Sequence, residues 1–240
     1  MTKFANRLRA ALVVAVLGLG SSSARSDTSL LQYEFQGQAG SETSLAPSMV
    51  ATGISGLNFT ESSVLSPSTG ANSMNSSGWN LANADYSFGF TIEAGQSVTV
   101  DQIILTSRSS ATGPGFINLE ASVDGAAPIT VASITQADTA FNDEFLSITP
   151  VTATSSLTFI FVAANQTSAD GGTIGSAGTF RIGDFNPPGT SPTPFTIDGT
   201  ISSVSAVPEP STLTLATIGL AVVGLAARHR KRAAMTIARD

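Results

Sequence analysis

The side chains best suited to chemistry in this sequence are carboxylates. Cysteine is absent from all 240 residues, which excludes thiolate catalysis and zinc bound through sulfur. The single histidine, His229, lies in a basic cluster near the C-terminus, so a Ser-His-Asp triad or a histidine-bound transition metal is excluded for the middle of the chain. What remains is a pair of acids, which glycosidases place about 5 to 9 Å apart.

Asp143 and Glu144 are the only adjacent acids between residues 27 and 207. Their context, ADTAFNDEF, is typical of a solvated loop, and neighbouring residues in a strand would point to opposite faces. A hydrolase that uses this pair is therefore only a third and remote alternative.

Sugar binding is the second option, because sugars stack on exposed aromatic rings. Tyr33 and Tyr86 alternate with apolar residues and are predicted to lie in the interior. Trp79, in the polar stretch NSSGWNLAN, could be an exposed platform for a sugar, but a buried residue that fixes its loop is the favoured interpretation.

The two arginines of the middle segment have both a binding and a structural interpretation. Arg108, in SRSSATGPG, could contact a sugar, but an ion pair with a carboxylate at a strand end is favoured. Arg181, in TFRIGD, falls on the face opposite Phe180 and Ile182, which predicts a salt bridge across two strands.

Calcium is the remaining candidate ligand, because it takes oxygen ligands from Asp, Asn and backbone carbonyls. Asp124-Gly125 and Asp170-Gly171-Gly172 fit such a site, but Asp-Gly is also the usual composition of a tight turn. Neither stretch has the spacing of an EF-hand loop. The sequence predicts no cofactor, and leaves one structural calcium ion open without a ligand set.

The charge of the middle segment argues against nucleic acid as a partner. Between residues 27 and 207 there are two arginines, no lysine and fifteen acids, a net charge of about −13. Non-specific binding to nucleic acid depends on Lys and Arg at the phosphates. The acids are spread singly among apolar residues, which is typical of a folded domain rather than of an acidic tail.

The N-terminal stretch has the three parts of a secretory signal. Lys3, Arg7 and Arg9 precede an apolar run from Ala10 to Gly20, and small residues follow, with Ala24 or Ser26 before the cut. Eleven helical residues cover only about 16 Å of a hydrocarbon core of about 30 Å. We predict a cleaved signal peptide over residues 1–26 and export of the remainder.

The C-terminal stretch predicts a transmembrane helix. Residues 211–227 carry no charge and would span about 25 Å as a helix. The basic residues that follow mark the cytoplasmic side: Arg228, Arg230, Lys231 and Arg232. Ahead of the helix, Pro208 and Pro210 keep the chain extended at the outer surface.

VPEPST, a short apolar helix and RHRKR, in this order, resemble the PEP-CTERM sorting signal of Gram-negative and related bacteria. The resemblance implies that Val207, Pro208, Glu209 and Pro210 form the motif recognised by an exosortase, a membrane-embedded transpeptidase-like enzyme. It further implies transient anchoring in the inner membrane, then release to the cell surface or to a matrix of extracellular polysaccharide. Residues 207–234 would form the sorting signal and 235–240 the end of the cytoplasmic tail.

Residues 27–206 are predicted to form one antiparallel β-sandwich, all-β and jelly-roll-like. Period-2 alternation recurs without a helical period, and turn residues separate the apolar stretches. SLTFIFVAA is apolar on both faces, which predicts a central strand covered on both sides. The proline-rich stretch 186–194 is predicted to be an inserted loop. Strands are expected at 30–35, 54–60, 86–92, 98–107, 117–123, 128–134, 145–149, 157–162, 179–185 and 195–201.

Segments such as YEFQG, SSGWN, FGFTIEAG, LEASVDG and FTIDGTI also resemble a recurrent ectodomain found ahead of such tails, which implies a jelly-roll module without a settled activity. The leading hypothesis is therefore a non-enzymatic structural or adhesive protein linked to exopolysaccharide. The alternative is a carbohydrate-binding β-sandwich module.

Overall fold

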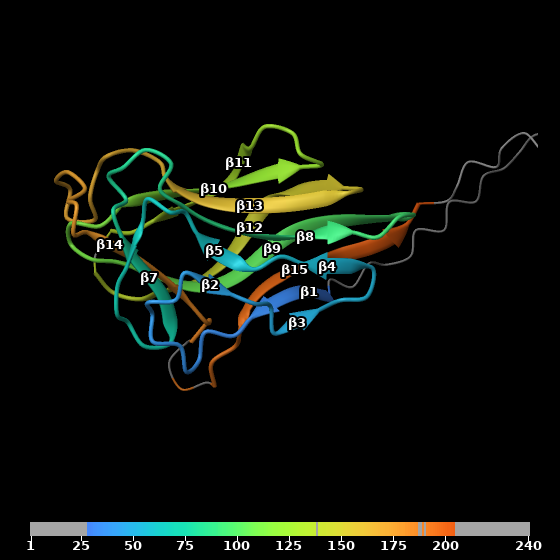
Figure 1. The fold of residues 1–240 in the computed structure, drawn as a ribbon, viewed down its shortest axis with the longest axis horizontal. Helices are drawn as coiled ribbons and strands as arrows, with labels where there is room; N and C mark the ends of the chain where they lie inside the picture. The colour runs from blue at the N-terminus through green and yellow to red at the C-terminus, as the bar shows by residue number, and fades with distance from the viewer. Residues whose placement is uncertain (1–27, 138, 187–188, 190, 205–240) are drawn as a thin grey trace, which may run out of the picture.

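A computed structural model describes residues 28–137, 139–186, 189 and 191–204. The expected signal peptide, sorting motif, transmembrane helix and basic cluster lie outside these residues. Within the part that is described, no helix is long and apolar enough to cross a membrane. The chain there forms two packed antiparallel β-sheets, as predicted from the alternating pattern (Figure 1).

The two sheets contain different sets of strands, in the following order. The first sheet has the order β3-β1-β15-β9-β14-β7-β6, with β12 also paired to β9. The second has the order β11-β10-β13-β8-β5-β2, with β4 also paired to β8. In Figure 1, β10, β11 and β13 lie above and β1, β3 and β15 below.

The bounds in the first sheet are β1 Thr28–Tyr33, β3 Met49–Val50, β6 Ser66–Pro67, β7 Ser73–Ser77, β9 Gln96–Ser109, β12 Asn142–Ala153, β14 Thr179–Gly183 and β15 Phe195–Ser203. Those in the second are β2 Ser44–Leu45, β4 Ile54–Gly56, β5 Phe59–Glu61, β8 Asp85–Ile92, β10 Phe116–Val123, β11 Ile129–Thr135 and β13 Ser156–Ala163.

Strand β13 corrects one expectation about burial. Leu157, Phe159 and Phe161 are buried between the sheets, whereas Ile160 and Val162 on the other face are only partly covered. The prediction of cover on both faces was wrong, because a two-layer sandwich packs only the inner face of each sheet.

Three other stretches differ from the predicted pattern. The strand expected at 54–60 is two short strands, β4 and β5, which pair in succession with β8. Asp143 and Glu144 lie in β12 and not in a loop. Strand β7, sequence SMNSS, was missed because its buried residues are mostly polar and show no apolar alternation.

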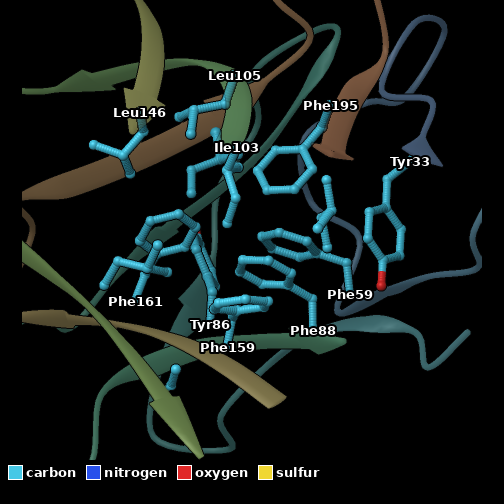
Figure 2. Packing of buried hydrophobic residues seen from close by; sticks show 14 of the residues in the cluster. Tyr33, Phe59, Tyr86, Phe88, Ile103, Leu105, Leu146, Phe159, Phe161 and Phe195 are labelled. Carbon is cyan, nitrogen blue, oxygen red and sulfur yellow. The ribbon is translucent and has the colours of Figure 1, made fainter. Parts of the chain in front are cut away.

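Aromatic rings fill the space between the sheets. Phe59 lies at the centre of this cluster, with ring centroids 5.0 Å from Phe88, 5.5 Å from Tyr33 and Phe35, and 5.6 Å from Phe195. Figure 2 shows the rings of Tyr33, Phe59, Phe88 and Phe195 packed with residues of both sheets. Such ring pairs add about 0.5 to 1.5 kcal/mol each beyond the burial of their area.

The long strand β9 organises the first sheet. One edge pairs with β12. The other pairs first with β15, up to Thr196 opposite Ile104, and then with β14, from Gly183 opposite Thr106. Residues 184–194 therefore interrupt what would otherwise be one continuous partner strand. This agrees with the inserted loop predicted at 186–194, whose one ladder contact among the described residues is a bridge between Phe185 and Thr193.

The described part of the chain begins and ends at the same end of the first sheet. Thr28 pairs with Gly199, and Ser203 pairs with Gln96. In Figure 1 β15 ends on the right of the sandwich.

We expect Phe59→Ala to lower the free energy of unfolding by about 3 to 5 kcal/mol, because it leaves a cavity among the aromatic rings. A loss of this size is a large part of the roughly 5 to 15 kcal/mol that stabilises a typical domain. Urea unfolding followed by tryptophan fluorescence measures the change. Phe116→Ala, at a side chain 39% exposed, is the control and should cost about 0.5 kcal/mol or less. Equal effects of the two substitutions would contradict the assignment of Phe59 to the centre of the core.

Candidate functional site

A pocket of about 200 Å³ lies where the partner strand of β9 is interrupted. Segments from five parts of the chain meet there: the residues after β1, those before β7, strand β9, the start of β12 and the end of β14 with the loop that follows it. Phe141 supplies an aromatic wall. The polar lining consists of Gln36, Asn72, Thr106, Asp143, Asp184 and Asn186.

Asp184 joins the start of β15 to the segment that follows β1. Its carboxylate accepts hydrogen bonds from the backbone N–H of Phe35 and of Gln36, both at 3.0 Å, and of Phe195 at 3.3 Å. The residue is buried, 4% exposed. Burial, together with the nearby carboxyl of Glu34, raises the pKa of Asp184 to about 7.

Asp143 lies on the opposite side of the pocket and is held by a small network. Its carboxylate accepts hydrogen bonds from the Thr106 hydroxyl and, at 3.0 Å, from the backbone N–H of Asn186. Because Thr106 and Asp143 are register partners on β9 and β12, this network ties the loop after β14 to two strands. The pocket therefore has two carboxylates fixed on its walls, available as acceptors for hydroxyl groups.

Exposed aromatic rings border the pocket along β12. Phe141 is 50% and Phe145 59% exposed. Phe145 packs against Phe185, with ring centroids 4.5 Å apart. With a period of two residues, Phe141, Asp143 and Phe145 share the outer face, while Leu146 and Ile148 are buried on the inner one. The result is an apolar rim next to a polar pocket.

The structure places Arg108 and Arg181 next to each other, which corrects the ion pairs expected for both. They are register partners on β9 and β14, and each guanidinium lies over the Phe141 ring, at 5.2 and 5.1 Å from its centroid. Arg181 donates to the Ser73 hydroxyl at 3.2 Å and to the Ala71 carbonyl at 3.3 Å. Among the described residues neither arginine forms an ion pair. Phe180 and Ile182 are buried on the other face, as predicted.

Trp79 is interior and offers no platform to a ligand. Its side chain is 1% exposed, its ring packs edge-on against Tyr86 and Phe180, and its indole N–H donates to the Ser76 carbonyl at 2.8 Å. This arrangement corresponds to the buried interpretation that the sequence favoured.

The two Asp-Gly stretches are turns whose carboxylates already have hydrogen-bond donors. The Asp124 carboxylate accepts hydrogen bonds from the backbone N–H groups of residues 154–156. These bonds, of which the one from Ser155 has the largest effect, hold the pKa of Asp124 well below its ordinary value. Asp170 accepts the Ser168 hydroxyl and the Gly172 N–H, and its pKa is lowered for that reason. Within the described ranges no group of three acidic or histidine side chains could hold a metal ion. Both stretches thus have the tight-turn structure that Asp-Gly commonly adopts.

The adjacent acids do not converge on the pocket. Asp143 lines it, whereas Glu144, on the other face of β12, does not. Burial and the neighbouring Asp143 raise the pKa of Glu144. The adjacent pair considered from the sequence therefore does not form a two-carboxylate site in this pocket.

Sequence reasoning missed Phe141, Phe145 and Asp184. Only rings with a polar edge were considered as platforms, and Asp184 looked like one of many separate acids. The alternation of aromatic and acid in FNDEF was an available signal, but it indicates exposure only once the segment is known to be a strand.

Protonation of Asp184 predicts a specific dependence of stability on pH. Because its folded pKa of about 7 lies above the unfolded value near 3.9, the folded state binds more protons between these limits. The contribution of Asp184 is therefore largest near pH 4 and is lost as the pH rises to about 7. Glu34→Gln removes the neighbouring charge and should flatten this decline and raise the Tm at pH 8.

Thermal unfolding from pH 4 to 8, for the wild type and for Glu34→Gln, measures the effect. Glu93→Gln, at an exposed site, controls for the loss of one negative charge. A decline of Tm with pH that is the same in all three proteins would refute the role of Glu34.

Comparison with known proteins characterises the C-terminal segment. No curated protein matches the chain. A protein-family model described as the PEP-CTERM protein-sorting motif matches residues 206–231. The match covers the proline-containing motif, the apolar run and most of the basic cluster, in agreement with the resemblance seen in the sequence. The C-terminus of this chain therefore carries a PEP-CTERM sorting motif, which implies export, association with the membrane and cell surface, and processing by an exosortase.

Proposed function

We propose that this protein is an exported, non-enzymatic adhesive protein that binds extracellular polysaccharide through the pocket between β12 and β14. The proposal assigns residues 1–26 to a signal peptide and 27–206 to a jelly-roll-like ectodomain. Residues 207–234 form the sorting signal and 235–240 the end of a cytoplasmic tail. The protein would pass through the inner membrane and then reside at the cell surface or in the matrix.

The observation that carries the proposal is an exposed aromatic rim beside a polar pocket. Phe141 and Phe145 present half-exposed rings, and Asp143, Asp184 and Asn186 line the adjoining pocket. Sugars have apolar faces of C–H groups and a rim of hydroxyls, so they match a surface that combines stacking with hydrogen-bond acceptors. Of the two functions expected from the sequence, the pocket favours carbohydrate binding over a purely structural role.

The pocket supports binding rather than turnover because its carboxylates have structural partners. Asp184 accepts three backbone N–H groups, and Asp143 accepts from Thr106 and Asn186. These bonds fix the acceptor positions, which lowers the cost of ordering the site on binding.

Phe145→Ala should weaken binding to a polysaccharide from the producing cell's matrix roughly tenfold. Such a change corresponds to about 1.4 kcal/mol, within the range of one lost stacking contact. Affinity electrophoresis or calorimetry with the purified matrix polysaccharide measures it. Phe116→Ala removes a ring from the second sheet and should leave binding unchanged. Undiminished binding by Phe145→Ala would contradict the location of the site, and a wild type that binds no matrix polysaccharide would refute the function.

Replacement of Pro208, Glu209 and Pro210 by alanine should block processing by the exosortase. The expected result is retention in the membrane fraction with the C-terminal peptide intact. Mass spectrometry of the C-terminus, on protein from native cells, distinguishes the two forms. Alanine at Ser211 and Thr212 is the matched control outside the triplet. Recovery of intact RHRKRAAMTIARD peptides on mature wild-type protein at the surface would show instead a permanent anchor.

A further inference from the structure

The only two cations between residues 27 and 207 lie side by side. Arg108 and Arg181 are direct register partners on neighbouring strands, where facing like charges are destabilising. Their proximity lowers the pKa of Arg181, an effect second to that of its burial. Fifteen acids are available in the same segment, yet within the described part of the chain none forms an ion pair with either arginine.

The structure fixes both guanidinium groups instead of letting them separate. Arg181 is held by the Ser73 hydroxyl and the Ala71 carbonyl. Gly70 lies against it so closely that a Cβ there would be 2.6 Å from Nη2. Both guanidinium groups lie over the Phe141 ring. The face of an aromatic ring attracts a cation, so this contact stabilises both charges in place.

Most of the hydrogen-bond donors of this pair meet no acceptor among residues 28–137, 139–186, 189 and 191–204. Arg181 uses Nε and Nη2 on neutral groups, and Arg108 makes no side-chain hydrogen bond to another described residue. Two adjacent guanidinium groups with free N–H donors match the oxygens of a carboxylate or sulfate, which arginine can bind in bidentate fashion.

We propose that Arg108 and Arg181 together bind an oxyanion, the carboxylate or sulfate of an acidic saccharide whose ring occupies the adjoining pocket. The assignment of the ligand to a saccharide rests on the proposed function. The arginines adjoin the pocket because they share two of its lining residues. Phe141 lies against both guanidinium groups, and the Ala71 carbonyl accepts a hydrogen bond from Arg181.

The charges around the pair limit the kind of anion that fits. Asp143 and Asp184 on the pocket walls repel a second anionic group, but they accept hydrogen bonds from hydroxyls. The net charge of about −13 also disfavours a densely charged polymer. The site therefore fits a polysaccharide in which neutral sugars separate the acidic ones, oriented with its anionic group toward the arginines.

Calorimetry on the full-length protein in detergent tests the proposal. The carboxylate probe is hyaluronan, in which glucuronate alternates with a neutral sugar, beside the same polymer with its carboxyl groups reduced. The sulfate probe is a galactan with one sulfate per disaccharide, beside its desulfated form. We expect at least one acidic polymer to bind tenfold or more tightly than its neutral form, and the preferred pair identifies the oxyanion. Polyglutamate, a peptide polyanion, should bind no better than the neutral polymers.

The variants separate the anion site from the pocket. Arg108→Gln and Arg181→Gln should each remove the preference for the acidic polymer, and Arg108→Lys should restore part of it. The Tm of Arg108→Gln should not fall, because this substitution relieves repulsion between like charges and removes no side-chain hydrogen bond to a described residue. Phe145→Ala should weaken binding to acidic and neutral forms alike.

Equal binding of acidic and neutral forms, with a loss in Phe145→Ala, would overturn the oxyanion site and leave the proposed function standing. Binding of polyglutamate as tight as that of the acidic polysaccharide would overturn the saccharide as ligand. If no polymer binds, NMR signals of the arginine Nε–H groups, followed during titration with methyl glucuronoside and sodium sulfate, give a second measurement. Absence of any shift at Arg108 and Arg181 would also overturn the proposal.

Discussion

One carboxylate, that of Asp184, holds together two chain segments at the point where the first sheet is interrupted. Strand β9 needs partners along both edges, and between Gly183 and Phe195 one edge loses its continuous partner. There Asp184 accepts the N–H group of Phe195, at the start of β15, and those of two residues that follow β1. Unpaired buried N–H groups would each cost about 1 to 3 kcal/mol, so these hydrogen bonds stabilise the chain at the interruption. Burial at this position, together with the neighbouring Glu34, raises the pKa of Asp184.

The pocket and the arginine pair both follow from this interruption. A regular sheet would present a flat outer face, whereas here the loop after β14 and the start of β12 enclose a space. The side chains at its border come from strands in register, so their spacing is set by the backbone: Thr106 opposite Asp143, and Arg108 opposite Arg181. The carboxylates accordingly lie on the pocket wall, with the two guanidinium groups beside it over the Phe141 ring.

The sequence predicted those parts of the fold that depend on local pattern. Alternation in β8 and β10 identified their buried faces, Asp124-Gly125 identified a turn, and the prolines of 186–194 identified a loop. It could not predict β7, whose residues are polar and become buried only through long-range pairing. The candidate site was missed for the same reason. Exposure of Phe141 and Phe145, like burial of Trp79, is decided by how the sheets stack and not by the neighbours of each residue.

Strand β15 separates the pocket from the last described residues of the chain. It has 9 residues and is about 30 Å long at roughly 3.3 Å per residue. It runs from Phe195, whose N–H donates to the pocket residue Asp184, to Ser203 at its other end. The segment that carries the sorting motif follows that other end in the sequence. A bound ligand at the pocket and the processing of the C-terminus would therefore act at sites separated by the length of this strand.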